Sequence, residues 1–268
     1  MQPTRREPGV RCSAATDLPM ARIALLDLDP QLGERLPAPD LALARRHLVA
    51  TTLDVPVGPW DVQPLTALGP TSLGLLVIDG VLAREATQAG RLTAQLFGPT
   101  DLLRPWTGAG PRVAMAWTAL TRATVAVVDQ RLITLCARWP SVLVELSRRA
   151  DAQTTRVGVQ LAIARLPRVD ERLLLGFWQL AESIGRVTPA GIRVPIPLTH
   201  GTIAALVAAS RPPVSAALAQ LAREKLIWRS GDGWLVAPRV EELAETIAAA
   251  ATDQAVSSSS RRSALRQR

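Results

Sequence analysis

The chain has 268 residues, 48% of them hydrophobic, so it is long enough for two folded domains and too apolar for global disorder. Its 31 basic and 23 acidic residues give a formal net charge of +8, which favours a polyanionic partner. A GC-rich genome would explain why Lys225 is the only lysine, but not why basic residues exceed acidic ones. With two cysteines and two histidines, the sequence offers no metal-ligand cluster, and we predict no cofactor. No apolar run approaches the roughly 18 residues of a membrane-spanning helix, so we expect a cytoplasmic protein without a membrane partner.

Both ends of the chain are polar and lack an apolar period. Residues 1–20 mix proline, glycine, arginine and serine, and we expect a disordered leader there. Residues 251–268 contain four consecutive serines followed by an arginine-rich end, which predicts a disordered basic tail. This tail either adds nonspecific attraction to phosphates or is simply an unstructured end.

Residues 21–138 are expected to form a β-roll or barrel, because short apolar segments recur between glycine and proline turns. Residues 75–78 and 81–82 flank Asp79-Gly80, a dipeptide typical of tight turns, and this pattern predicts a β-hairpin. Further strands are predicted at residues 92–96, 113–117 and 125–127. A short helix is predicted at residues 41–46.

Residues 141–166 contain no proline and one glycine, and their apolar residues predict a single helix of about 25 residues, or ~38 Å. The apolar stripe includes Val142, Leu143, Leu146, Ala150, Val157 and Leu161. Neither flanking domain obviously covers this stripe, so residues 139–166 are predicted to be the dimerisation helix of a homodimer. The alternative is that the helix packs back on its own β-domain.

Residues 167–250 have the pattern of a winged helix-turn-helix. A helix is predicted at residues 170–184, followed by an extended segment at residues 193–198. Two short apolar stripes then lie on either side of Ala208-Ala209-Ser210. The stripes comprise Ile203, Leu206 and Val207, and then Val214, Leu218 and Leu221. Two amphipathic helices that meet at such a corner, followed by a hairpin around residues 230–233, are typical of a DNA-binding wing and helix pair.

The second helix of this corner carries the candidate base-reading residues. Ser210 is placed as its N-cap, and Arg211 and Pro212 lie in its first turn. Arg211 can bond guanine through two N–H groups, a contact that contributes about 1–3 kcal/mol of discrimination. Ser215 is predicted to face a base or a phosphate.

Three further residues are candidate phosphate contacts. Thr199 and His200 lie at the start of the first helix, which crosses the DNA backbone, and Arg229 lies in the wing. For His200 the alternative is an ordinary surface residue or a helix cap. Residues 168–239 carry nine basic and five acidic residues, which is consistent with double-stranded DNA as the partner and also with a charged solvated face.

The order of β-roll, long helix and winged helix-turn-helix resembles the Crp/Fnr family of bacterial transcription regulators. The resemblance is most specific from Thr199 to Leu218. It implies an α+β fold, a contact between Arg211 and guanine, and phosphate contacts by Thr199, His200 and Ser210. RNA polymerase is a further partner that the resemblance suggests. Two departures predict an unusual operator: Pro212 replaces a commonly acidic residue, and Ala216 stands where some members have a second arginine.

The N-terminal half resembles the family's cyclic-nucleotide-binding domain more weakly. The segments 79–81 and 98–103 are similar to its glycine corners. Arg104-Pro105 and Val113-Ala114 replace its phosphate-binding Gly-Glu and arginine pairs, and Arg112 is one residue out of place. A buried cyclic phosphate would lack a charge partner, so we predict that the protein does not respond to cyclic AMP and that its effector is unknown. The chain also lacks the cysteines of an iron–sulfur sensor.

Two other classes of function compete with a regulator. An enzyme with a site in the β-domain is one, although the sequence shows no constellation of nucleophile and base. A winged-helix protein-interaction module is the other, because Pro212-Pro213 weakens the face that would read DNA.

Overall fold

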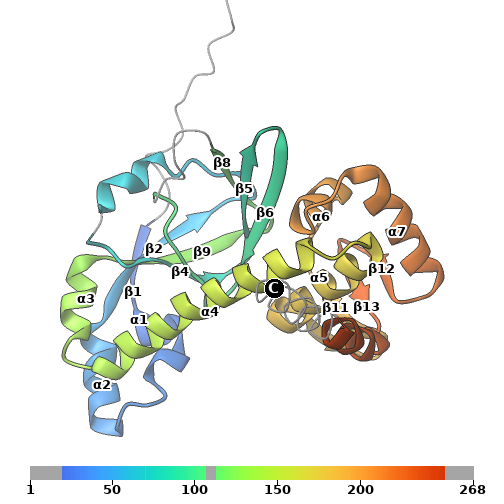
Figure 1. The fold of residues 1–268 in the computed structure, drawn as a ribbon. Coiled ribbons are helices and arrows are strands. Elements are labelled where there is room, and N and C mark those ends of the chain that lie inside the picture. The colour runs from blue at the N-terminus through green and yellow to red at the C-terminus, as the bar shows by residue number, and fades with distance from the viewer. Residues whose placement is uncertain (1–19, 70, 107–112, 251–268) are drawn as a thin grey trace, which may run out of the picture.

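The computed structural model describes residues 20–69, 71–106 and 113–250 (Figure 1). The predicted leader and tail therefore lie outside the described residues, except for Met20. A β-domain occupies the left of Figure 1, a C-terminal domain of helices and a small sheet occupies the right, and the long helix α4 extends from one to the other.

The β-domain contains two antiparallel sheets. One has five strands in the order β1-β2-β9-β4-β7, and the other has four in the order β3-β8-β5-β6. The strands of the first are β1 (Met20–Ala24), β2 (Val49–Val55), β4 (Gly74–Asp79), β7 (Leu102–Leu103) and β9 (Ala123–Val128). Those of the second are β3 (Gly58–Pro59), β5 (Leu82–Gln88), β6 (Arg91–Phe97) and β8 (Ala114–Ala119). The predicted strands 92–96, 113–117 and 125–127 correspond to β6, β8 and β9.

Alternation along β9 explains how this part of the chain forms two cores. Val125 and Val127 pack between the two sheets with Phe97 and Trp117, whereas Ala126 and Val128 face the other side. Side chains alternate between the faces of a strand, and both faces of β9 are buried over Val125–Val128, which explains the unbroken apolar run there. The second core is covered by the helices around the sheet.

The predicted hairpin at Asp79-Gly80 is wrong. β4 pairs with β7 and β9, whereas β5 pairs with β6 and β8, so the chain passes from one sheet to the other at this point. Gly80 has φ +82°, and a Cβ atom there would lie 2.3 Å from the carbonyl oxygen of Arg122. An Asp-Gly pair meets the need for positive φ equally well in a hairpin or at a corner, so local sequence does not distinguish the two.

Short helices surround the β-domain. They are α1 (Leu25–Leu28), η1 (Pro30–Gly33), α2 (Ala38–His47), η2 (Gln63–Leu68) and α3 (Gln130–Cys136). α2 contains the predicted helix at residues 41–46, while α1 and the two 3₁₀ turns are too short to give a periodic signal.

The predicted long helix is α4, Pro140–Ala164, and its two halves differ in packing. In the first half, Val142 and Leu146 are buried against the β-domain, so packing on the same chain is correct there. In the second half Leu161 is 58% exposed, and Val157 and Val159 are also exposed. The stripe that looked continuous in sequence is therefore covered only along its first half.

A buried ion cluster holds the first half of α4 in place. Arg149 is 4% exposed and binds the carboxylate of Asp29, which lies just before η1. The Nε atom of Arg149 also donates to Glu145, at 3.2 Å. A hydrogen bond from Arg148, together with the bond from Arg149, lowers the pKa of Glu145 to about 2.

The C-terminal domain contains the predicted winged helix-turn-helix. Its helices are α5 (Val169–Ile184), α6 (His200–Leu206) and α7 (Arg211–Arg223), and residues 239–250 are also helical. Its sheet has the order β10-β11-β13-β12, with strands Arg186–Thr188, Gly191–Val194, Gly233–Val236 and Ile227–Ser230 in that order. Residues Ile203, Val214, Leu218 and Leu221 meet in the core as their spacing predicted. The strand β10 was not predicted.

Within the described residues, no single helix is long and apolar enough to cross a membrane. The bent pair α6 and α7 reaches the required length and composition only when the two helices are taken together, and their axes turn by 103°.

Candidate nucleic-acid interface

The corner between α6 and α7 is closed by backbone bonds around a left-handed residue. Ala208 has φ +50°, and the amide of Ala209 donates to the carbonyl of Ala204 at 2.9 Å. This 6→1 backbone hydrogen bond is typical of a Schellman motif at a helix C-terminus, in which the left-handed residue is usually glycine. The 103° turn that results is typical of a helix-turn-helix, and it leaves the N-terminus of α7 accessible.

Ser210 is the N-cap of α7, as predicted, but its side chain forms no capping hydrogen bond. An N-cap hydroxyl normally accepts from the amide of the second or third helical residue. These residues are Pro212 and Pro213, which have no N–H group. The hydroxyl of Ser210 is therefore available to another partner.

Arg211 is the first residue of α7, and its side chain is exposed. It forms no hydrogen bond or ion pair with any residue that the structure describes. Pro212 is exposed beside it, while Val214 is buried beneath. In Figure 1, α7 lies on the far side of the C-terminal domain from the β-domain, so the β-domain does not cover this helix.

His200 and Ser215, predicted as separate contacts, are bonded to each other. The Nδ1 atom of His200 lies 2.9 Å from the Oγ atom of Ser215, and both residues are half-buried. The imidazole also lies against Trp234, with 6.1 Å between ring centroids. His200 is therefore neither a free surface residue nor a helix cap, because its side chain joins the start of α6 to α7. The two positions are fifteen residues apart, and no local pattern in the sequence signals the contact.

Thr199 is the N-cap of α6. Its Oγ1 atom accepts from the amide of Thr202 at 3.1 Å and lies 2.9 Å from the hydroxyl of that residue. The side chain is exposed, so capping orients the hydroxyl without covering it.

The wing is the hairpin of β12 and β13, in which Ser230 pairs with Gly233 across a two-residue turn. Asp232 at the tip is paired with Arg193 at 2.6 Å, which offsets a negative charge that would repel phosphate. Arg229 is exposed and has no hydrogen bond or ion pair to a described residue. Its position opposite Trp234 places a free guanidinium on the wing.

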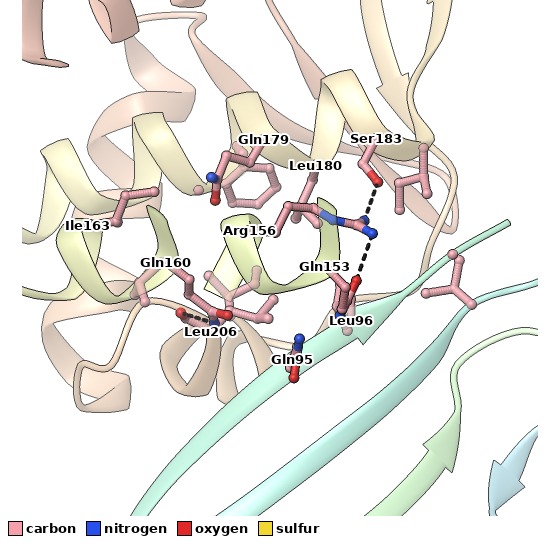
Figure 2. A pocket seen from close by; sticks show the side chains of 17 residues that line it. Gln95, Leu96, Gln153, Arg156, Gln160, Ile163, Gln179, Leu180, Ser183 and Leu206 are labelled. Carbon is pink, nitrogen blue, oxygen red and sulfur yellow. Dashed lines mark hydrogen bonds between the residues drawn. The ribbon is translucent and has the colours of Figure 1, made fainter. Parts of the chain in front are cut away.

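The contact between the β-domain and the helix-turn-helix was not predicted from the sequence. The side-chain amide of Gln160 in α4 donates to the carbonyl of Ala94 in β6 at 2.7 Å. It also donates to the carbonyl of Leu206 in α6 at 3.0 Å (Figure 2). One side chain thus links three elements. Beside it lies a cavity of about 90 Å³ between β6, α4, α5 and α6.

Arg156 also lines this cavity, as Figure 2 shows, but it is not free to receive an anion. Its guanidinium binds both carboxylate oxygens of Asp101 and lies 2.6 Å from Gln153. The cavity therefore belongs to a structural contact between the domains. Within the described residues, no group of three or more potential metal ligands is found.

Comparisons with known proteins agree with this architecture. Residues 171–246 match the Crp-like helix-turn-helix domain. A search of curated proteins finds no match.

Three solved structures have the same fold. A CooA variant from Carboxydothermus hydrogenoformans is 15% identical, with a TM-score of 0.58, and the match covers 82% of this chain and 95% of that one. A CRP/FNR-family transcriptional regulator from Thermus thermophilus is 19% identical, with a TM-score of 0.54 and coverage of 72% and 98%. FixK2 from Bradyrhizobium japonicum is 16% identical, with a TM-score of 0.54 and coverage of 72% and 96%. This chain thus combines a Crp-like helix-turn-helix domain at residues 171–246 with the fold of a CRP/FNR-family regulator, and this combination supports a role as a DNA-binding transcriptional regulator.

Proposed function

We propose that the protein is a homodimer that binds a near-palindromic operator, with the start of each α7 in the major groove of one half-site. Arg211 carries this proposal. Its guanidinium is exposed at the first turn of α7 and makes no bond to a described residue. A side chain in this state can bond the O6 and N7 atoms of guanine without breaking an existing interaction.

The other candidate contacts surround Arg211 in a way that supports this docking. Ser210 has an unused hydroxyl beside it, and Thr199 presents an oriented hydroxyl from α6. Arg229 supplies a free charge on the wing. We assign these three, with the outer nitrogen of His200, to phosphates, because groups that hold the backbone set the register of the base-reading helix.

The dimer contact is proposed for the outward face of α4. Val144 is 56% exposed and Leu161 is 58% exposed, so this face leaves large apolar side chains in water at both ends of the helix. A second copy of α4 would cover them and relate the two helix-turn-helix units by a two-fold axis. Half-sites about 34–36 Å apart then follow from one turn of DNA.

Selection from a random-sequence duplex library with the full chain tests this function. We expect enriched sites with two inverted halves that contain guanine, and binding that weakens steeply with salt. In sedimentation, Leu161→Glu should be monomeric and bind the selected site weakly. The control Leu92→Glu, which alters an exposed leucine of β6 in the β-domain, should remain dimeric. Enrichment of no sequence, or a monomeric parent chain, would contradict the proposal.

We further propose that cyclic AMP is not the effector. Arg104 donates to the carbonyl of Ser72, and Arg84 lies over the rings of Phe97 and Trp117. Both guanidinium groups are therefore engaged with the protein, and Arg112 lies outside the described residues. A cyclic phosphate would be poorly compensated here. Micromolar binding of cyclic AMP in calorimetry would overturn this statement.

A protein-interaction module is the second candidate, favoured by the exposed apolar residues Pro212 and Ala216 on α7. Such a module would not select a DNA sequence, and any DNA binding would be nonspecific and electrostatic, so it would weaken with salt equally for all sequences. The library selection therefore separates the two functions.

A further inference from the structure

The outer face of α7 has an apolar centre. Val214, Leu218 and Leu221 are buried, which turns Pro212, Ala216 and Ala219 to the opposite side, and all three are exposed. Their spacing of four and three residues forms one line along the helix. We call these three residues the apolar stripe. Arg211 and Ser215 lie along one edge of it.

The apolar stripe cannot read a base by hydrogen bonding. Proline and alanine side chains have no donor or acceptor, and Pro212 and Pro213 also lack backbone N–H groups. A donor or acceptor on a base edge that faces the stripe would lose water without gaining a partner. The thymine 5-methyl group is the one apolar feature of the major groove, and it gains from such a contact.

Ser215 does not change this conclusion. Its hydroxyl is bonded to His200, which holds it to the side of the stripe nearest α6. The hydrogen-bonding groups at the start of α7 are thus the N-cap Ser210 and one edge of the helix, at Arg211 and Ser215, while the centre remains apolar.

Given the proposed function, we infer that each operator half-site is read in two chemically different ways. Arg211 bonds a guanine, and the apolar stripe contacts the 5-methyl groups of thymines in the adjacent base pairs. The specificity-determining residues are therefore Pro212 and Ala216 as well as Arg211, and the stripe selects A·T pairs by their methyl groups.

Deoxyuridine tests this inference, because it pairs as thymine does and differs only in lacking the methyl group. In a duplex that carries the selected site, each thymine of one half-site is replaced in turn, and the affinity of the full chain is measured by fluorescence anisotropy. Burial of one methyl group contributes about 0.8 kcal/mol, so we expect a loss of about fourfold at the thymines that face the stripe. A 5-methylcytosine placed at those positions should bind more tightly than cytosine by a similar factor.

A protein variant completes the experiment. Ala216→Asn introduces an amide that can bond adenine at N6 and N7, so the deoxyuridine effect at the facing position should disappear. Ala222→Asn, at an exposed position near the end of α7, should retain the effect. If deoxyuridine binds as tightly as thymine at every position while Arg211-dependent selection persists, the inference is wrong and the proposed function stands. If no sequence is selected at all, the proposed function is itself wrong.

Discussion

Two arginines that join the β-domain to α4 differ from Arg211 and Arg229 of the helix-turn-helix domain in what they bind. Arg149 is enclosed by Asp29 and Glu145, and Arg156 is held by Asp101. Arg211 and Arg229 are exposed and form no bond with described residues. A guanidinium already paired with a carboxylate stabilises the fold, whereas one in water can exchange that water for phosphate or guanine at little cost. We therefore propose that Arg211 and Arg229, whose guanidinium groups are free, contribute to the DNA-binding surface.

Removal of Arg149 should have the largest effect on stability. Arg149→Met leaves Asp29 buried without its partner, and loss of one member of a buried pair costs about 3–5 kcal/mol. Urea unfolding measures the change. Arg148→Ala, which removes the exposed neighbour on the same helix, is the matched control and should cost much less. Equal effects from the two variants would show that burial of the pair does not matter.

Acid should weaken the same cluster. The folded-state pKa of Glu145 is about 2 and thus lies below its ordinary value of 4.5, so the carboxylate contributes stability that is fully present above about pH 4.5. That contribution is lost as the pH falls from 4.5 towards 2. The unfolding free energy measured at pH 7, 4.5 and 3 should show this decline, and Glu145→Gln should reduce its slope. A variant with an unchanged slope would assign the acid sensitivity to other groups.

The Gln160 link between the domains is expected to contribute less to the unfolding free energy than the Arg149 cluster does. Gln160→Glu replaces the amide that donates to Ala94 and Leu206 with an acceptor, so two carbonyl groups lose their donor, at about 1–3 kcal/mol. Limited proteolysis should then cut faster between α4 and α5, at residues 165–168. Gln153→Glu is the control, because its oxygen accepts from Arg156 and the change keeps an acceptor there. Equal protection in both variants would contradict a linking role for Gln160.

A smaller change should stabilise the corner. Ala208 has φ +50°, a conformation that glycine adopts without strain, so Ala208→Gly should raise the unfolding free energy by about 0.5–1 kcal/mol. Ala219→Gly, in the middle of α7, should lower it by about 1 kcal/mol. Thermal unfolding of the two variants gives opposite shifts if the corner is strained. A loss of stability in both variants would show that the backbone of Ala208 is not strained.

The sequence predicted the helix-turn-helix well because its signals are local. The burial of Ile203, Val214 and Leu218 follows from helical spacing, and the wing follows from a glycine turn between two apolar segments. It failed where partners are distant. β4 pairs with β9, some fifty residues away, and nothing near Asp79-Gly80 distinguishes that pairing from a hairpin.

The candidate site shows the same division. The positions of Ser210 and Arg211 at the start of α7 could be read from the sequence, and the exposure of Arg211 follows from them. The bond between His200 and Ser215 depends on how two helices meet, which no local pattern encodes. The unused hydroxyl of Ser210 could have been predicted, since two prolines follow at the positions whose amides it would cap.

The most direct test of a base-reading role for Arg211 is the ratio of affinities for the selected site and for a duplex in which its guanine is replaced. For the parent chain and for Arg131→Ala, which removes an exposed arginine of the β-domain, this ratio should be the same. For Arg211→Ala it should fall by roughly fivefold to 150-fold, equivalent to about 1–3 kcal/mol, with the dimer and its unfolding free energy unchanged. An unaltered ratio in Arg211→Ala would contradict the account.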